Sequence, residues 1–432
     1  METNSFKAYK WRFVNLTFLC LAVFSSTFQA MLYAAIGNII TKFYNVSYTA
    51  VSFTMVVISL VEIFVSHIFG IITAKIGFGP TMMISAMLNA FGACVKCIAV
   101  ERNFFPLLIF GQVFIAASVQ FNFILIPFLG TSWFRQNELE IMQGIVYSCL
   151  PAGMVFSFLS LIVFKNVNTI YDINERFVYL STLIAAVQVL IFFATLIFVK
   201  NKPPTPPSRA EQIRNEREAP SYTVVFKNLN YIILVITGSS LVVLEMGMFI
   251  SLNQSLFDVY KEASAITVIA GILRCIGGIF GSMLAGLALK KYSKYRLIFA
   301  LEIFLLALSY VLFTVGLWVK MATLIYISTF IGGITSVGSI TVCMTFIVEL
   351  TYPVKESVTA GVFYVFANSA TVFIVPLVAY LISKFGAVKG NILLPAIGVV
   401  AFVLGCFVKE DLRRKRANAE KTNETSPLAA KK

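Results

Sequence analysis

Long apolar runs, separated by charged residues, glycine or proline, repeat along the whole chain. Each run is long enough for a membrane-spanning helix, which needs roughly 20 mostly apolar residues. The runs do not show the strict alternation of apolar and polar positions that is typical of barrel strands. The pattern therefore predicts an all-α membrane protein whose twelve transmembrane helices occupy residues 13–40, 48–73, 81–100, 104–128, 141–164, 177–199, 231–257, 263–289, 297–318, 322–348, 358–383 and 390–408.

Composition supports this interpretation. The chain has 432 residues, of which 59% are hydrophobic and 12% charged. An average soluble protein is about half apolar and about a quarter charged. The apolar excess indicates that lipid surrounds most of the molecule, so we expect an integral multi-pass protein.

The basic residues are distributed unevenly between the two ends of the predicted spans. Of the 34 lysine and arginine residues, 24 lie on the side that holds both termini and eight lie on the other side. Because positive residues stay in the cytosol, we expect both termini to be cytosolic, in the plasma membrane or alternatively in an organelle membrane. The net charge of +14 does not indicate nucleic-acid binding, because the charges lie between apolar runs and not on one aqueous face.

The side chains that usually support catalysis or hold a cofactor are scarce. The seven cysteines lie within or at the ends of apolar runs, so neither disulfides nor a metal site is expected. An acyltransferase or phosphotransferase usually needs histidine or clustered acids in an aqueous loop. This chain has one histidine, and it has no ATP-binding motif. We expect no enzyme and no cofactor, although a membrane-embedded transferase or a multipass receptor or scaffold remains the alternative.

The chain divides into two similar parts. A proline-rich and charged segment, 200–230, separates a six-helix bundle over 1–199 from a second one over 231–408, and a basic tail covers 409–432. Both parts carry a related hairpin: Gly70 and Ala74 followed by Lys75, and Gly286 and Lys290 followed by further basic residues. The two glycines are 216 residues apart, half the chain. This arrangement resembles the major facilitator superfamily, which is built from two pseudo-symmetric six-helix halves.

Further phrases are similar to the feline leukaemia virus subgroup C receptor-related family of facilitators. They are Phe28, Gln29, Tyr33 and Asn38; Leu88, Asn89, Gly92, Ala93, Lys96 and Cys97; Gly111, Gln112, Gln120, Pro127, Trp133 and Phe134; Leu252, Asn253 and Gln254; Glu349, Leu350, Thr351, Tyr352 and Pro353; Gly390, Asn391 and Ile392; and Asp411, Leu412, Arg413 and Arg414. The resemblance implies a secondary transporter or facilitator that moves choline, ethanolamine or haem by alternating access, with an unrelated small organic ion as the remaining alternative. We expect the protein to act as a monomer.

The sequence departs from the family where the family binds choline. The resemblance implies an aromatic cage, whose ring faces attract quaternary ammonium by cation–π interaction. The family's tryptophan in the first span falls at Ala30, and its tyrosine in the seventh span falls at Met246. Its two glutamines fall at Leu150 and Asn368. Family resemblance therefore implies transport more firmly than it implies choline.

Charged and amide side chains inside spans are the remaining candidates, because they are costly in lipid. The ionisable ones are Glu62, His67, Lys96, Glu245, Arg274 and Glu302. Glu245 either faces a cavity or pairs with Arg274, and His67 is either a haem ligand or a packing residue. The expected substrate-binding set is Gln29, Ala30, Gln120, Leu150, Glu245, Met246, Gln254 and Asn368.

Overall fold

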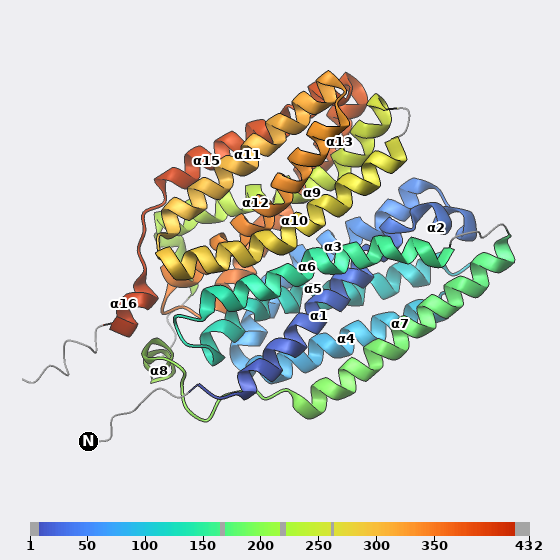
Figure 1. The fold of residues 1–432 in the computed structure, drawn as a ribbon. Coiled ribbons are helices and arrows are strands. Elements are labelled where there is room, and N and C mark those ends of the chain that lie inside the picture. The colour runs from blue at the N-terminus through green and yellow to red at the C-terminus, as the bar shows by residue number, and fades with distance from the viewer. Residues whose placement is uncertain (1–7, 165–168, 217–221, 261–262, 420–432) are drawn as a thin grey trace, which may run out of the picture.

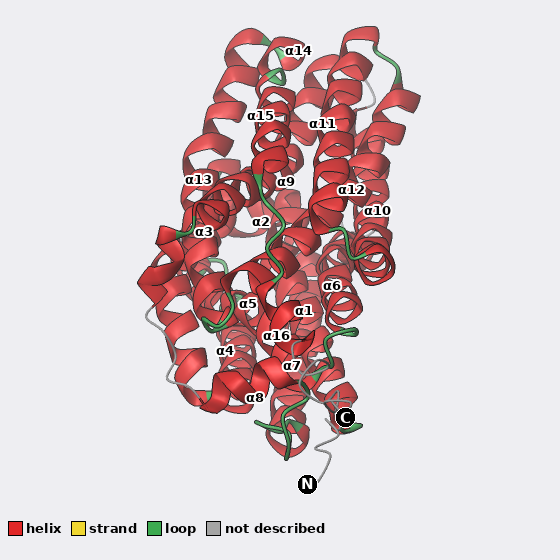
Figure 2. Ribbon diagram, turned by 90° about the vertical axis from the view of Figure 1, so that its left-hand side faces the viewer, coloured by secondary structure: helices red, strands yellow, loops and turns green. Residues whose placement is uncertain are grey.

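The structure is a bundle of long helices. The computed structural model describes residues 8–164, 169–216, 222–260 and 263–419, and the predicted basic tail is therefore described only as far as residue 419. Within these ranges all regular structure is helical (Figure 2). Twelve helices in the described part of the chain are long and apolar enough to span a membrane, which confirms the predicted number.

The first half contains six of these helices. They are α1 (Trp11–Ala35), α3 (Tyr48–Ile76), α4 (Phe78–Ile98), α5 (Phe105–Trp133), α6 (Leu139–Leu159) and α7 (Ile170–Phe198). A short helix, α2 (Gly37–Tyr44), follows α1, and a 3-10 turn over Ser160–Phe164 extends α6.

The second half repeats the arrangement. Its helices are α9 (Leu229–Val259), α10 (Ala263–Tyr292), α11 (Tyr295–Val319), α12 (Ala322–Thr351), α13 (Glu356–Phe385) and α15 (Leu393–Phe407), the last preceded by α14 (Ala387–Gly390). Two short helices lie outside the spans: α8 (Arg209–Glu216) between the halves and α16 (Arg413–Ala419) after α15. A 3-10 turn, Tyr222–Lys227, precedes α9.

Some predicted boundaries were wrong where polar residues belong to a helix. The predicted span 177–199 begins at Ile170, because Thr169 and Asp172 form a capping box that starts α7 before its apolar run. The predicted span 104–128 continues through Pro127 to Trp133. The predicted span 13–40 is two helices that meet at Ile36, so its last residues belong to α2.

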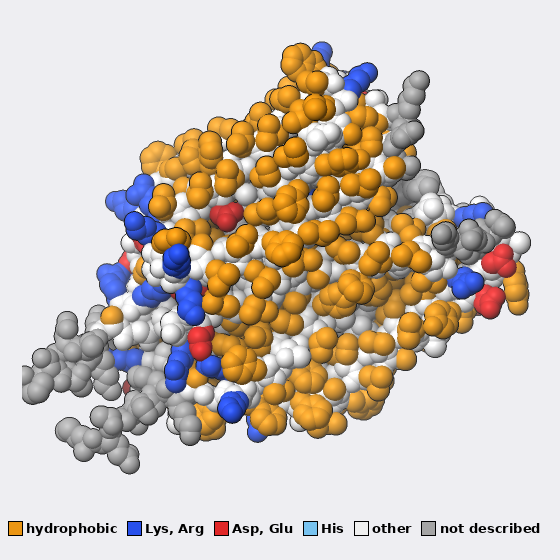
Figure 3. Space-filling model, in the orientation of Figure 1, with side chains coloured by type: hydrophobic (Ala, Val, Ile, Leu, Met, Phe, Trp, Pro, Cys, Tyr) orange, Lys and Arg blue, Asp and Glu red, His pale blue; other side chains and the backbone are white. Residues whose placement is uncertain are grey.

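Both described ends of the chain lie at the same end of the bundle, together with α8 and α16 (Figure 1). We call this end the terminal face and the other end the opposite face. Lys and Arg side chains gather at the terminal face, while hydrophobic side chains cover the long sides of the molecule (Figure 3). This distribution is the one that a bilayer around the middle of the bundle requires.

Glycines let the two halves approach each other closely. A Cβ at Gly70 of α3 would lie 2.5 Å from the carbonyl oxygen of Ser357 of α13, and a Cβ at Gly286 of α10 would lie 2.5 Å from that of Glu140 of α6. These are the two hairpin glycines singled out by their spacing. The repeated motif therefore marks equivalent helix crossings between the halves.

Within the second half, α10 and α12 are also in backbone contact. A Cβ at Gly281 would collide with the carbonyl of Ile334, whereas a Cβ at Gly271, on the same helix, would meet nothing within 4 Å. We expect Gly281→Ala to lower the free energy of unfolding by at least about 2 kcal/mol, because overpacking forces the backbones apart. Gly271→Ala is the matched control and should change it little. Thermal unfolding of both purified variants measures the difference, and equal stability would contradict this packing.

Candidate functional site

A cavity of about 130 Å³ lies between the two halves near the middle of the helices. It is lined by α1, α3, α5 and α6 from the first half and by α9, α12 and α13 from the second. Most of its wall is apolar. The polar side chains that line it are Thr27, Ser59, Glu62, Tyr147, Glu245, Tyr364, Asn368 and Thr371. A mid-depth cavity between two repeats is where transporters of this architecture bind substrate.

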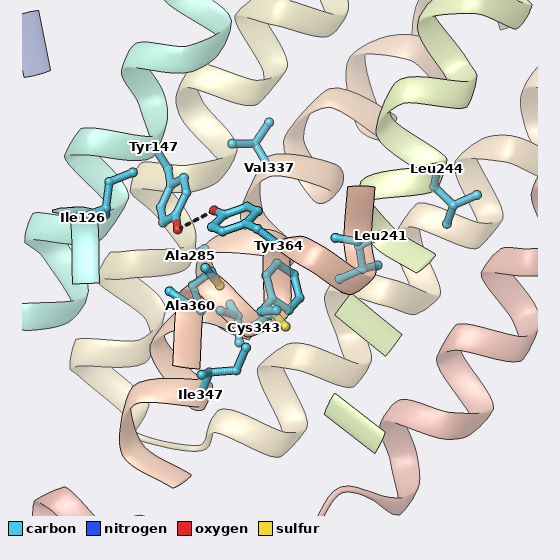
Figure 4. Packing of buried hydrophobic residues seen from close by; sticks show 14 of the residues in the cluster. Ile126, Tyr147, Leu241, Leu244, Ala285, Val337, Cys343, Ile347, Ala360 and Tyr364 are labelled. Carbon is cyan, nitrogen blue, oxygen red and sulfur yellow. Dashed lines mark hydrogen bonds between the residues drawn. The ribbon is translucent and has the colours of Figure 1, made fainter. Parts of the chain in front are cut away.

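Two tyrosines form the floor of the cavity on its terminal side. The hydroxyls of Tyr147 on α6 and Tyr364 on α13 point toward each other and lie 3.5 Å apart (Figure 4). The ring of Phe123 stacks on that of Tyr364 with centroids 5.2 Å apart. Cys343, Ile347 and Ala360 pack beneath them (Figure 4). The floor is therefore aromatic above and apolar below.

The halves are joined at the floor and on its terminal side. Thr345 donates to the Gln143 side chain at 2.6 Å, and Tyr295 donates to Glu140 at 2.8 Å. Lys355 donates to the carbonyl of Ala74 at 2.6 Å. Further hydrogen bonds between the halves, from Gln136 to Glu349 and from Arg414 to the carbonyl of Thr131, also lie on the terminal side of the tyrosine pair. In this conformation the protein is closed at the terminal face.

Glu62 supplies a carboxylate without an ion-pair partner. It lies on α3, is 6% exposed and lines the cavity. Across the described part of the chain it forms no salt bridge. Its polar neighbour is Asn368 of α13, which also lines the cavity. The two side chains come from opposite halves, so the cavity presents a carboxylate and a neighbouring amide to whatever enters it.

Glu245 both lines the cavity and pairs with Arg274. The sequence left open whether Glu245 faces a cavity or pairs with Arg274, and the structure shows that it does both. Arg274 is 2% exposed and lies 3.4 Å from the hydroxyl of Tyr310, which donates in turn to the carbonyl of Leu244 at 2.7 Å. The pair places its opposite charges side by side, which leaves Glu62 as the uncompensated carboxylate of the cavity wall.

Five residues of the expected substrate-binding set line the cavity: Ala30, Leu150, Glu245, Met246 and Asn368. The other three lie elsewhere. Gln29 donates to Asn89 at 2.8 Å inside the first half, and Gln254 donates to the carbonyl of Ala379 at 3.0 Å. Gln120 is fully buried and does not line the cavity. Sequence alone could not separate these amides, because all of them lie within spans and only the rotation of each helix decides which face is central.

The other ionisable candidates do not line the cavity. The backbone of His67 on α3 lies against Gly361 of α13, and His67 does not line the cavity. Lys96 donates to the carbonyl of Gln29 at 3.4 Å, and its ammonium lies 4.7 Å from the centre of the Tyr33 ring. The carboxylate of Glu302 lies against Gly338, between α11 and α12. Within the described residues no group of three or more His, Cys, Asp or Glu could hold a metal ion.

Sequence reasoning missed the aromatic floor. Tyr147 and Tyr364 are 217 residues apart, close to the spacing of the hairpin glycines, so each occupies the equivalent position in its own half. Extending the internal comparison beyond the hairpins would have found this pair. Phe123 carries no such signal, because it is one of 41 phenylalanines in the chain.

Comparison with known proteins agrees with this architecture. The choline/ethanolamine transporter FLVCR2 of Rattus norvegicus is 28% identical over 97% of this chain and 78% of its own, and that of Homo sapiens is 27% identical over 95% and 79%. These relatives confirm the resemblance to the feline leukaemia virus subgroup C receptor-related family. An uncharacterised MFS-type transporter of Caenorhabditis elegans is 25% identical over 96% of this chain.

Solved structures show the same fold. The transporter FucP in the outward conformation superimposes with a TM-score of 0.73 at 11% identity, covering 93% of this chain and all of FucP. The proton:xylose symporter XylE superimposes with a TM-score of 0.70 at 12% identity. The family model described as the Major Facilitator Superfamily matches residues 18–321. The chain therefore belongs to the Major Facilitator Superfamily and is a solute transporter of twelve membrane-spanning helices.

Proposed function

We propose that this protein carries a small organic cation of the choline and ethanolamine class across the membrane by alternating access. The observation that carries the proposal is Glu62, an unpaired carboxylate in a largely apolar cavity between the halves. A buried charge without a partner is costly, and a cationic ligand would offset that cost. The names of the FLVCR2 relatives support this class of substrate.

The remaining groups of the cavity suit such a ligand. Ring faces attract an ammonium group, and Phe123, Tyr147 and Tyr364 place three rings at the floor. Asn368 offers a hydrogen bond to a hydroxyl. A hydroxyl two carbons from a cationic nitrogen is the feature that choline and ethanolamine share.

The proposal includes the setting of the transporter. We infer that the terminal face, where Lys and Arg gather, is cytosolic, and that the membrane is the plasma membrane. The structure would then represent the state that is closed to the cytosol. The protein acts as a monomer and performs no catalysis, because one chain holds the whole cavity and the proposed task requires no bond to be broken.

The charge of Glu62 is the first point to test. We expect Glu62→Gln to raise the KM for radiolabelled choline and ethanolamine uptake by about tenfold or more, since a hydrogen bond to a charged group contributes about 1.5–3 kcal/mol. Glu302→Gln is the matched control, because it removes another carboxylate from within a span that does not line the cavity. Uptake into cells that express each full-length variant measures both, and an unchanged KM in Glu62→Gln would exclude this role.

The ion pair should behave as a structural unit. We expect Arg274→Met alone to cost about 3–5 kcal/mol of stability, because it leaves the Glu245 carboxylate buried without its partner. The double variant Glu245→Gln/Arg274→Met should regain much of this loss. Thermal unfolding in detergent compares the two. A double variant that is no more stable than Arg274→Met would show that the pair is not the source of the cost.

A substitution at Met246 tests how the cavity wall recognises choline. This residue lies on the cavity wall where the resemblance implies a tyrosine. We expect Met246→Tyr to lower the KM for choline by about two- to tenfold, because each cation–π contact contributes about 0.5–2 kcal/mol. Met246→Leu keeps an apolar side chain without a ring and should leave the KM close to the original. Competition uptake measures the KM for choline in both variants. An equal change in KM for Met246→Tyr and Met246→Leu would contradict the proposed contact.

A further inference from the structure

A second cavity, of about 300 Å³, lies at the terminal face and shares no lining residue with the central one. Its wall combines the junction of α3 and α4, the last part of α5, the segment from Asn201 to Asn215 between the halves, and Lys355 just before α13. We call it the terminal-face cavity. The prolines between residues 203 and 207 form one side of it. Because proline fixes its own backbone angle, this side is stiff although it is not a helix.

Four basic side chains line the terminal-face cavity: Lys75, Lys202, Arg214 and Lys355. Among the described residues, only one carboxylate, that of Glu211, lines it with them. Arg214 is bound to Glu211 and to Glu356, so its charge is already matched. Lys75 and Lys202 have no ion-pair partner among the described residues. The cavity therefore keeps an excess of positive charge.

The position of Lys355 shows how closely these charges gather. Its ammonium donates to the carbonyl of Ala74 at the end of α3, which holds it against the other half. Its pKa is lowered, first by burial and then by the neighbouring charges of Arg214 and Lys202. Basic residues at a cytosolic membrane surface normally spread into water, where repulsion is screened within about 8–10 Å. Here the fold places Lys75, Lys202 and Lys355 around the terminal-face cavity.

We propose that the terminal-face cavity binds an anion that carries at least two phosphate charges, either a phospholipid headgroup or a soluble phosphate ester. Clusters of Lys and Arg on the cytosolic side of transmembrane helices are suited to this chemistry, because each basic side chain attracts an anionic phosphate. The ligand would contact Lys75 from the first half, Lys202 from the connecting segment and Lys355 from the second half.

Such a ligand stabilises one conformation of the transporter. When the terminal face is closed, the basic residues of both halves share one cavity. Opening that face moves Lys355 away from Lys75 and removes part of the site. A ligand shifts a conformational equilibrium in favour of the state that it binds more tightly. The bound anion therefore favours the closed terminal face, and transport should slow as the anion concentration rises.

The test uses the purified full-length protein without any transport substrate, so its outcome is independent of the proposed cargo. Thermal unfolding is recorded against inositol hexakisphosphate, against dioctanoyl phosphatidylinositol bisphosphate, and against sulfate at matched ionic strength. We expect a concentration-dependent rise in Tm with one or both phosphate probes and little rise with sulfate. A response to the soluble probe alone or to the lipid alone supports the site and identifies the source of the phosphate.

Two double variants decide whether the cavity is responsible. Lys75→Gln/Lys202→Gln should shift the half-effective concentration upward at least about tenfold, since each basic residue near an anionic headgroup contributes about a fivefold gain in affinity. Both side chains are exposed, so the Tm without ligand should not change. Lys291→Gln/Lys294→Gln removes the same charge from the same face outside this cavity. The proposal is overturned by equal shifts in the two variants, or by no rise in Tm with either phosphate probe.

Discussion

The arrangement of the whole molecule depends on backbone contacts between its two halves. At Gly70 and Gly286 the absence of a side chain brings α3 onto α13 and α10 onto α6. A second pair repeats this one turn further along, because a Cβ at Gly144 would lie 2.6 Å from the carbonyl oxygen of Ser282, and one at Gly361 equally close to that of Ser66. Helices held by such contacts touch without interlocking side chains. They are therefore suited to tilt against each other, which alternating access requires.

The cavity is built symmetrically but charged asymmetrically. Its tyrosine floor, formed by Tyr147 and Tyr364, repeats between the halves, as do Ala30 and Met246 on its wall. Glu62 does not repeat, since the position 216 residues further on is Gly278. Duplication thus explains the shape of the cavity, whereas its carboxylate without an ion pair belongs to one half only. A polar ligand consequently meets two unlike walls.

Sequence predicted the fold well because the signal for a membrane helix is local. Apolar length and the position of basic residues are properties of single segments, and the twelve spans follow from them. The predicted helix boundaries were wrong where a helix begins at polar residues, as at Thr169, or where an apolar run divides into two helices, as at Ile36. Neither feature changes the number of spans.

The cavity was harder to predict, because it depends on how each helix is rotated. Gln120 and Val119 are neighbours in the chain, yet only Val119 lines the cavity. Glu245 could be placed both in a cavity and beside Arg274 only when both helices were seen together. The basic residues of the terminal-face cavity are far apart in the sequence, and no local sequence pattern predicts that they come together.

An ionised Glu62 would also determine where the membrane potential acts in the proposed transport. In the proposed cycle, a monovalent cation that binds beside this carboxylate makes the occupied site electrically neutral. Moving one elementary charge through the full potential involves about 2.3 kcal/mol per 100 mV. The loaded carrier escapes most of this energy, whereas the empty carrier, with its carboxylate ionised, does not. The voltage across the bilayer would then govern the return of the unoccupied protein more strongly than the passage of its cargo.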